Sequence, residues 1–482
     1  MKTKLSVATL TIAIMLIIVL LYSGCSQKET QPNFIIILAD NLGYGDIACF
    51  GSDLHRTPNI DNLANEGMRL TSFYSASGVC TPSRASLMTG CYAQRVDMHL
   101  SENGLAVLRP VSSKGLNPEE ITIADILKEK GYSTACIGKW HLGDQPECLP
   151  LRHGFDYYYG IPYSEDMIPS FDPSWPDLPL IENDTVVEAP VDLATTTRRY
   201  VKEAIRFITE NQDKPFFLYF PHNLPGSRAI PIVDKKFAGK SANGPWGDAI
   251  EEIDWSVGQI IKRVKELGLE KNTIIVFTSD NGAPQGLSGS SKGGSNEPFS
   301  GAGYTTMEGG MRVPAIVKWS GSIPEGRSND ELCTMMDWLP TFADLAGAQI
   351  SQDRIIDGKN IWPLLSGDES AKTPYKVFYY YFMDQLQAVR EGNWKLHLAW
   401  DNKYDGIYKS KLYGNSKLQL VDLGNDVKEE YDVSEQYPEV VERLLQYAET
   451  ISKELGDPQH KGEQIQPALY VNNPKPLIKK LQ

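Results

Sequence analysis

The sequence predicts an α/β fold, in which a large, mostly parallel sheet carries helices on both faces and a smaller α+β subdomain follows. Continuous apolar runs such as residues 33–39 are typical of strands buried on both faces. Amphipathic stretches with helical spacing alternate with these runs, an order typical of parallel sheets. The length of 482 residues exceeds the about 250–300 residues of a single core. We therefore expect an α/β domain over residues 33–386 and an α+β subdomain over residues 387–482.

The elements of the large domain follow from caps, stops and apolar spacing. The first helix begins at Thr57-Pro58, a cap residue followed by a first-turn proline, and ends at Gly67. Residues 69–76 read as a strand, and the next helix begins at Cys80 and ends at Gly90. The same signals predict further helices at residues 122–131, 201–208, 250–268 and 335–346, and strands at 132–137, 215–220, 273–278 and 312–318.

Two loops and the tail differ from this pattern. Residues 155–190 are rich in Tyr, Pro and Trp, and residues 282–303 are rich in Gly and Ser. Loops longer than about 15 residues are usually functional or disordered. In the tail we expect one strand with an exposed face that ends a hairpin, a second strand, and an amphipathic helix, at residues 388–398, 417–423 and 438–455.

The first 24 residues read as an export signal. Lys2 and Lys4 precede an apolar run over residues 5–21, and small residues then lead to Cys25. This order resembles a bacterial lipoprotein signal, in which Cys25 becomes the lipidated N-terminus, although Tyr22 stands where leucine is usual. A plain cleaved signal and an uncleaved anchor are the two alternatives. All three predict a protein exported to the periplasm or the cell surface, and the first predicts a lipid anchor in the membrane.

Overall charge limits the class of partner, and the cysteine count limits the disulfide pairing. The net charge of −14 argues against nucleic acid as a partner, because a phosphate backbone requires a positive field. Seven cysteines is an odd number, so at least one lies outside any internal disulfide.

Polar side chains follow four of the predicted buried strands. Asp40-Asn41 follows the first, Lys139 and His141 the second, His222 the third and Asp280-Asn281 the fourth. One such pair alone is most simply a turn or a helix cap. In open α/β sheets, however, ligands bind just outside the carboxyl ends of the strands. The four ends together therefore predict a functional site at this edge.

The pentapeptide Cys80-Thr81-Pro82-Ser83-Arg84 opens the predicted helix that ends at Gly90. A helix N-terminus gathers unpaired N–H groups that face an anion. Arg84 lies about one turn after Cys80, so its guanidinium can reach back toward position 80. A small buried cysteine at a helix start is the simpler alternative for this residue taken alone.

This pentapeptide, with the segments around it, resembles the type I sulfatases, which have an alkaline-phosphatase-like fold. The resemblance covers nearly the whole chain after the signal and rests on residues 33–40, 43–46, 80–90, 138–143, 278–282 and 308–314. It implies that a formylglycine-generating enzyme oxidises Cys80 to formylglycine (3-oxoalanine), whose hydrate carries two hydroxyls. The implied activity is hydrolysis of sulfate esters, on a sulfated carbohydrate or an aryl sulfate.

The resemblance also implies a role for each residue at the strand ends. One hydroxyl of hydrated formylglycine 80 would attack sulfur, and His141 would deprotonate the second hydroxyl, which expels sulfate. Arg84 and Lys139 would stabilise the hydrate and bind the sulfate oxygens, and His222 would bind the sulfate ester and protonate the leaving oxygen. Asp40, Asn41, Asp280, Asn281 and the modified Cys80 would hold a divalent cation. Such oxygen ligands favour Ca²⁺, with Mg²⁺ as the alternative.

Three positions depart from the family pattern. Asn41 stands where a second aspartate is usual, which removes one negative charge from the metal site. His222 lies one residue farther from the following proline than is usual. Gly303 stands where a lysine usually binds sulfate, five residues before Glu308. Either Lys292 replaces that lysine or the substrate is held differently.

Two other functions fit parts of the sequence. A phosphoesterase or phosphonate hydrolase could use the same scaffold, although it would normally carry Ser or Thr as nucleophile. A lipoprotein that binds sulfated glycans without turnover would be consistent with Gly303. The remaining histidines, for which we expect surface or hydrogen-bonding roles, are His55, His99, His153, His397 and His460. Of these, His99 and His153 lie in segments that could line the pocket.

Overall fold

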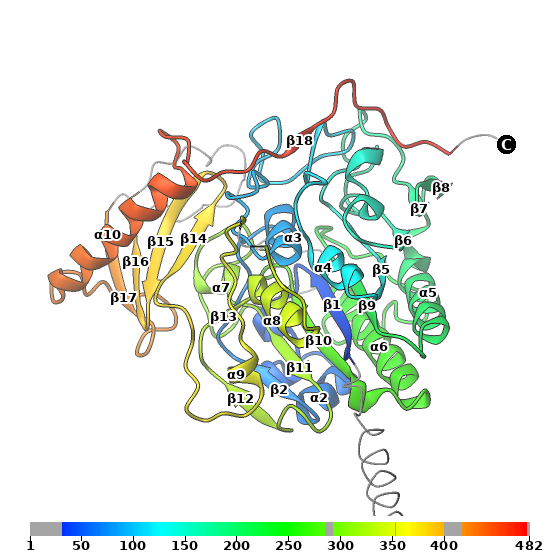
Figure 1. The fold of residues 1–482 in the computed structure, drawn as a ribbon, viewed down its shortest axis with the longest axis horizontal. Coiled ribbons are helices and arrows are strands. Elements are labelled where there is room, and N and C mark those ends of the chain that lie inside the picture. Colours follow the sequence, from blue (N-terminus) through cyan, green and yellow to red (C-terminus); the bar gives the residue numbers. More distant parts are fainter. Residues whose placement is uncertain (1–30, 285–292, 352, 400–416, 480–482) are drawn as a thin grey trace, which may run out of the picture.

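The computed structural model describes residues 31–284, 293–351, 353–399 and 417–479. Its centre is a ten-stranded mixed sheet in which β10, β1, β9, β5 and β6 are parallel neighbours (Figure 1). The predicted α/β fold is confirmed. In spatial order the strands are β12 (Arg327–Asn329), β2 (Met68–Leu70), β11 (Ala315–Lys318), β10 (Thr273–Ser279), β1 (Asn33–Asp40), β9 (Phe216–Pro225), β5 (Ser133–Ile137), β6 (Tyr157–Gly160), β7 (Leu180–Glu182) and β8 (Thr185–Glu188).

Helices cover both faces of this sheet because β1 is apolar on both. Ile35 and Ile37 pack in one core with residues of α2 (Pro58–Asn65), α5 (Thr196–Glu210) and α6 (Gly244–Glu266). Phe34 and Ile36 pack in a second core with residues of α3 (Cys80–Thr89), α4 (Ile123–Glu129) and α8 (Trp338–Leu345). The strand that the sequence predicted as doubly buried therefore separates two hydrophobic layers.

The C-terminal subdomain is a four-stranded antiparallel sheet with one long helix, at the left of Figure 1. It consists of β14 (Phe378–Phe382), β15 (Gln385–Glu391), β16 (Trp394–His397), β17 (Gln419–Asp422) and α10 (Pro438–Leu455). The sheet begins before the expected boundary at residue 387, which falls inside β15. The single strand expected over residues 388–398 is two strands, and most of their side chains are buried.

Several shorter elements complete the chain. The loop over residues 155–190 contains β6, β7 and β8, which extend the main sheet. The strand expected at residues 312–318 begins at Ala315 and runs antiparallel to β10. The remaining elements are β3 (Phe73–Tyr74), β4 (Lys114–Gly115), β13 (Cys333–Thr334), β18 (Leu469–Tyr470), α7 (Glu308–Met311) and α9 (Trp362–Leu365).

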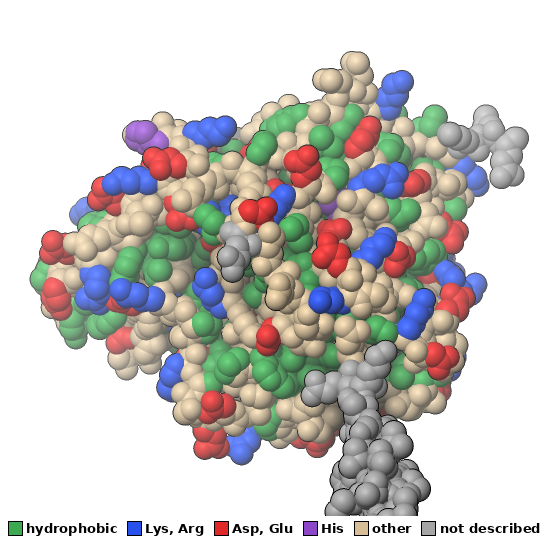
Figure 2. Space-filling view, viewed as in Figure 1, with side chains coloured by type: hydrophobic (Ala, Val, Ile, Leu, Met, Phe, Trp, Pro, Cys, Tyr) green, Lys and Arg blue, Asp and Glu red, His purple; other side chains and the backbone are tan. Residues whose placement is uncertain are grey.

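Membrane-spanning helices, cysteine pairing and surface charge were predicted from the sequence and can be compared with the described residues. None of the helices in the described ranges is long and apolar enough to cross a membrane, and Cys25 lies outside those ranges. All six cysteines within them are unpaired. Acidic and basic side chains alternate over the face in Figure 2, so this face offers an anion no broad positive field.

Candidate active site

The register of the parallel strands brings the predicted polar residues to one edge. Ala39 pairs with Ser279, which places Asp40 beside Asp280. The N–H of Lys139 donates to the carbonyl of Pro221 at 2.9 Å, next to His222. A side chain at Gly138 would place its Cβ 1.8 Å from that same carbonyl, so only glycine lets β5 approach β9 here.

Asp40 is the centre of a buried ion-pair network. The Nζ of Lys139 lies 2.9 Å from each carboxylate oxygen of Asp40, and a guanidinium nitrogen of Arg84 lies 3.0 Å from Oδ1. All three side chains are fully buried. Burial alone would raise the pKa of Asp40, but Lys139 and Arg84 overcome this effect and hold it well below its usual range.

Asp280 is the second carboxylate of the site. Arg84 donates to its Oδ2 from Nε at 3.0 Å and from a terminal nitrogen at 2.8 Å. The N–H of Asn41 donates to its Oδ1 at 2.9 Å. Burial and the neighbouring Asp40 raise the pKa of Asp280 to about 6. Two carboxylates in contact repel each other, so a further positive charge between them would stabilise the site.

The donor atoms here fit a hard divalent cation. Ligand atoms of Asp40, Cys80 and Asp280 lie within 4.8 Å of one another. Oδ1 of Asn281 is buried and has no partner within the described part of the chain. Its Nδ2 donates to Oδ1 of Asn41 at 2.6 Å, so the amide oxygen of Asn41 lies beside the amide group of Asn281. Carboxylate and amide oxygens are the ligands that Ca²⁺ and Mg²⁺ prefer.

Cys80 is the first residue of α3 and is buried against the two aspartates. Its Sγ lies 3.4 Å from Oδ1 of Asp40 and 3.8 Å from Nζ of Lys139. Burial and the charge of Asp40 raise the pKa of the Cys80 thiol well above its usual value. A neutral thiol is a poor nucleophile, so an unmodified Cys80 would not be reactive.

Arg84 holds the carboxylates instead of reaching back directly to Cys80. Besides its bonds to Asp40 and Asp280, it donates to the carbonyl of Lys139 at 2.8 Å. The guanidinium therefore joins the ends of β1, β10 and β5. Its rigid planar fork suits this role, and lysine could not make the same set of bonds.

His141 presents an unprotonated nitrogen. Its Nε2 lies 3.1 Å from the carbonyl of Leu108, which can only accept, so Nε2 carries the proton. Nδ1 is buried without a partner in the described residues. Burial, together with Lys139 and Arg84, lowers the pKa of His141 well below its usual value. The neutral ring is therefore able to accept a proton at Nδ1.

His222 lies inside β9, which continues to Pro225, and α6 holds its ring. Its Nε2 lies 2.9 Å from Oγ of Ser256, whose own proton is donated to the carbonyl of Ile253 at 2.7 Å. Nε2 therefore carries the proton, and Nδ1 is buried without a partner among the described residues. Burial lowers the pKa of His222 to about 3. The neutral ring accepts at Nδ1, and it could donate there only after protonation, which an anionic ligand would favour.

Gly303 leaves no room for a longer side chain. A Cβ there would lie 2.6 Å from the carbonyl oxygen of Gly282 and 3.2 Å from Nδ2 of Asn281. The N–H of Gly303 also donates to the carbonyl of Ala283 at 3.0 Å, which fixes the two segments together. Lys292 lies outside the described residues.

Three polar residues at the site were not predicted from the sequence. Oγ of Ser164 accepts from Lys139 at 3.1 Å and donates to Glu165 at 2.9 Å. The other oxygen of Glu165 accepts from the N–H of Ser227 at 2.6 Å, and Oγ of Ser227 accepts from Asn41 at 3.0 Å. These residues lie in the aromatic loop and after His222, where the sequence carries no signal beyond the unusual composition of the loop.

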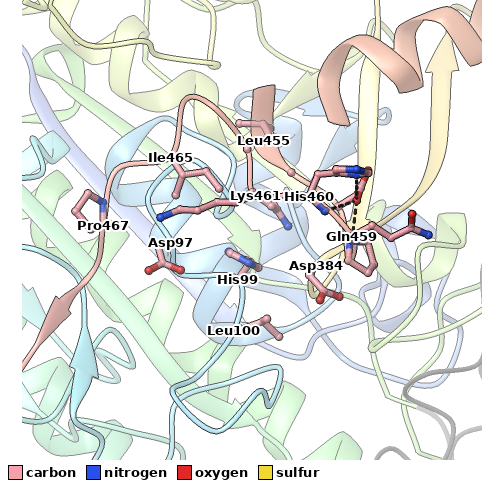
Figure 3. A pocket seen from close by; sticks show the side chains of 15 residues that line it. Asp97, His99, Leu100, Asp384, Leu455, Gln459, His460, Lys461, Ile465 and Pro467 are labelled. Atoms are coloured by element: carbon pink, nitrogen blue, oxygen red, sulfur yellow. Dashed lines mark hydrogen bonds and ion pairs between the residues drawn. The ribbon is translucent and has the colours of Figure 1, made fainter. Parts of the chain in front are cut away.

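A separate cavity of about 420 Å³ lies where the tail meets the segment after α3 (Figure 3). Leu100, Asp384 and Lys461 point into it around His99. Nδ1 of His99 is buried without a partner among the described residues, and burial and Lys114 lower its pKa to about 4. The other histidines have hydrogen-bonding or packing roles. His55 contacts the carbonyl of Asp46, His397 contacts Glu429 and His460 contacts Asp457, whereas the ring of His153 packs against Trp140.

Two family descriptions match the chain. Residues 32–348 match the Sulfatase family, and residues 305–454 match the C-terminal region of N-sulphoglucosamine sulphohydrolase. The first match contains every residue of the site described above, and the second includes the four-stranded sheet.

Individual proteins resemble the chain over most of its length. An N-acetylgalactosamine-6-sulfatase of Canis lupus familiaris is 35% identical, with 90% of this chain and 89% of the relative covered. A steryl-sulfatase of Homo sapiens is 36% identical, with 78% and 76% covered. The crystal structure of Ps i-CgsB in complex with k-i-k-neocarrahexaose superposes with a TM-score of 0.73 at 29% identity, with 90% of this chain and 95% of that chain covered.

Proposed function

The chain belongs to the sulfatase family, and from this premise we propose that it removes sulfate from sulfated sugars, with Cys80 converted to formylglycine as its nucleophile. Hydrolysis of sulfate esters is the activity of the family, and the chain is an enzyme of this class. The modification, the identity of the cation and the substrate are the parts that we propose.

One observation carries the proposal. Cys80 begins a helix at the point where two carboxylates, Lys139 and Arg84 meet, and all of these side chains are buried. A buried thiol with a raised pKa is inert as it stands. Conversion of this residue to an aldehyde, whose hydrate carries hydroxyls, would place a nucleophile at the centre of the charged network. A maturation enzyme must act on Cys80 before or during folding, because Cys80 is only 3% exposed in the folded chain.

Ca²⁺ is the cation that we propose, held by Asp40, Asp280, Asn281 and Asn41. The oxygens of these side chains come from two strand ends, an irregular arrangement that Ca²⁺ tolerates better than Mg²⁺ does. When bound, such an ion supplies Lewis acidity, which neutralises charge on the sulfate oxygens.

The remaining side chains bind the sulfate ester and move protons. Lys139 and Arg84 present positive charge beside Cys80 and stabilise negative oxygens there. His141 accepts a proton at Nδ1, since Nε2 is committed to Leu108. His222 binds the ester and, once the anionic substrate favours its protonation, donates to the leaving oxygen.

The substrate class is supported by the relatives. One relative is named for N-acetylgalactosamine 6-sulfate, and one similar structure holds a neocarrahexaose. Another is named for steryl sulfates, so an apolar alcohol is the competing class. A signal with a lipidated Cys25 would place the enzyme in the periplasm or at the cell surface, where sulfated polysaccharides are met.

The test begins with the peptide that contains Cys80. Mass analysis of protein from the native host should find formylglycine at position 80, and Cys80→Ala should turn over 4-nitrophenyl sulfate at least 10³-fold more slowly. An intact thiol in active enzyme, or an unchanged rate in the variant, would refute the role of Cys80. Faster turnover of 4-nitrophenyl phosphate than of the sulfate would instead favour a phosphoesterase.

A further inference from the structure

We propose that the groove between residues 103–111 and 171–176 binds a second, anionic sugar of the substrate, next to the sugar that loses its sulfate. The groove has a volume of about 830 Å³, and both apolar and polar side chains line it. Ligand sites in proteins commonly have this size. This inference rests on the proposed function, because it adds a subsite to the same reaction.

An aromatic pair, exposed Phe171 and partly buried Trp175, forms one wall. Phe171 and Trp175 stack with their ring centroids 5.6 Å apart and their planes at 7°. Phe171 is 68% exposed, the largest exposed fraction among the large apolar side chains of the described residues. An exposed apolar surface on a loop commonly marks a binding site. The C–H face of a sugar ring is apolar and flat, and it would cover such a pair.

Arg109 supplies the charge. Its guanidinium carbon lies 5.3 Å from the centre of the Trp175 ring, and its Nε is buried without a hydrogen-bond partner among the described residues. Asp172 interacts electrostatically with Arg109. Its Oδ1, however, already accepts from the N–H and hydroxyl of Ser174 at 2.9 and 2.7 Å. Within the described ranges Arg109 has no ion pair. A carboxylate or sulfate group of a sugar would satisfy its donors.

Two hydrogen bonds fix Arg109 relative to the candidate catalytic histidine. On one side of it, the carbonyl of Leu108 accepts from His141. On the other side, the N–H of Val111 donates to Asp144 at 2.5 Å. Both partners belong to the segment that follows β5, so the distance between Arg109 and His141 is set by the backbone. Because Arg109 directly follows Leu108 in the chain, a sugar bound at Arg109 would lie next to the residue that holds His141.

The backbone of this rim is strained. Val111 has a φ of 62°, a left-handed conformation that β-branched residues rarely adopt. Such strain persists where the surroundings impose it, which is common at binding sites. The left-handed conformation of Val111 turns the chain directly after Arg109-Pro110, and Arg109 and Val111 both line the groove.

The experiment compares substrates with and without a second sugar. We would measure kcat/KM for 4-nitrophenyl sulfate, a chondroitin 6-sulfate tetrasaccharide, the same tetrasaccharide with its carboxyl groups reduced, and a carrageenan tetrasaccharide. The variants are Phe171→Ala, Trp175→Ala and Arg109→Gln. The control is Tyr431→Ala, which removes another aromatic ring that is 67% exposed.

We expect the wild type to prefer at least one tetrasaccharide over 4-nitrophenyl sulfate, and Phe171→Ala and Trp175→Ala to lower that preference at least tenfold. Arg109→Gln should lower the preference for a tetrasaccharide by the same factor, for substrates whose second sugar carries the anion. If the anion is a carboxylate, the effect of Arg109→Gln disappears on the carboxyl-reduced tetrasaccharide. If it is a sulfate, the effect remains there and is found with the carrageenan tetrasaccharide. Tyr431→Ala should leave every ratio unchanged.

Two results would overturn the inference. One is a wild type that hydrolyses 4-nitrophenyl sulfate but prefers neither tetrasaccharide. The other is a set of variants that lose activity equally on all substrates, which would indicate a structural role for the loop. A wild type without sulfatase activity on any substrate would instead contradict the proposed function, so the two failures are distinguishable.

Discussion

The Nζ atom of Lys139 lies 2.9 Å from both carboxylate oxygens of Asp40, at a place where neither side chain is exposed to solvent. Burying a charged pair costs several kcal/mol per ion, and good geometry at best repays it. Such a pair is therefore weak evidence for stability. A buried charged network around a cysteine at the start of a helix is better explained by chemistry at that cysteine.

Replacement of Lys139 by Met should separate these two explanations. Met keeps most of the side-chain volume but removes the positive charge beside Cys80 and Asp40. We expect kcat for 4-nitrophenyl sulfate to fall about 10²–10³-fold, as for the loss of one preorganised charge-stabilising donor. Steady-state kinetics on folded protein, verified by circular dichroism, gives the measurement.

Lys128→Met provides the matched control. Lys128 lies on α4 and is 48% exposed, in an ion pair with Asp156. Surface pairs contribute about 0–1 kcal/mol, so this variant should keep the wild-type rate. A Lys139→Met enzyme as active as this control would show that Lys139 has no part in the reaction.

Residues at strand ends could be predicted because parallel strands bring their carboxyl ends to one edge. For this reason Lys139 contacts Asp40, and Arg84 joins Asp40 to Asp280. Glu165 could not be predicted, because its partners are chosen by the path of a long loop, which apolar spacing does not encode. The hairpin at Gly392 was missed although its signal was present. A Gly-Asn pair there separates β15 from β16, and apolar residues on both sides made them read as one strand.

Asn41→Asp should strengthen cation binding. The variant adds a carboxylate beside Asp280 and Asn281, and the affinity of calcium sites rises with the number of charged ligands. We expect the dissociation constant for Ca²⁺ to fall about tenfold. Without the ion, three carboxylates would repel one another, so the variant should melt at a lower temperature than the wild type after treatment with a chelator. Calorimetric titration and thermal unfolding with and without Ca²⁺ measure the two effects.

Asn473→Asp is the control for the backbone. Asn473 and Asn41 both have left-handed φ angles, 54° and 63°, but Asn473 is exposed. Its replacement should leave the affinity for Ca²⁺ unchanged. Equal affinities for all three proteins would argue that Asn41 lies outside the metal site.

Gly303→Lys should fail to restore the lysine that is usual at this position. The new Cβ would lie 2.6 Å from the carbonyl oxygen of Gly282, so Gly282 or the neighbouring Asn281 must move. We expect kcat/KM for 4-nitrophenyl sulfate to fall at least tenfold, because Asn281 is a proposed metal ligand. Gly303→Ala carries the same Cβ without the charge, so its kcat/KM should fall by the same factor. Higher activity in Gly303→Lys alone would mean that the backbone adapts and that the site lacks a cation.

We predict that Glu308 stabilises the contact between the C-terminal subdomain and the large domain. Its Oε1 accepts from Lys395 on β16 and from Tyr380 on β14, both at 3.0 Å, and its other oxygen accepts from Tyr74 on β3. Replacement by Gln removes the charge and leaves Lys395 paired with Glu429 alone, at 2.7 Å. We expect the free energy of unfolding at pH 7 to fall by about 3 kcal/mol, as when a buried pair loses one partner. Glu369→Gln, at a side chain that is 89% exposed, should leave it unchanged.

The pH dependence of stability should change in the same variant. Burial alone would raise the pKa of Glu308, but Lys395, Arg390 and Arg312 hold it well below its ordinary value of 4.5. The folded chain therefore binds a proton at Glu308 less readily than the unfolded chain does. Its contribution to stability is fully present above about pH 5 and is lost as the pH falls further. Urea unfolding between pH 7 and pH 3.5 should show a smaller acid loss of stability for Glu308→Gln than for the wild type. Parallel curves would mean that this carboxylate does not titrate differently in the two states.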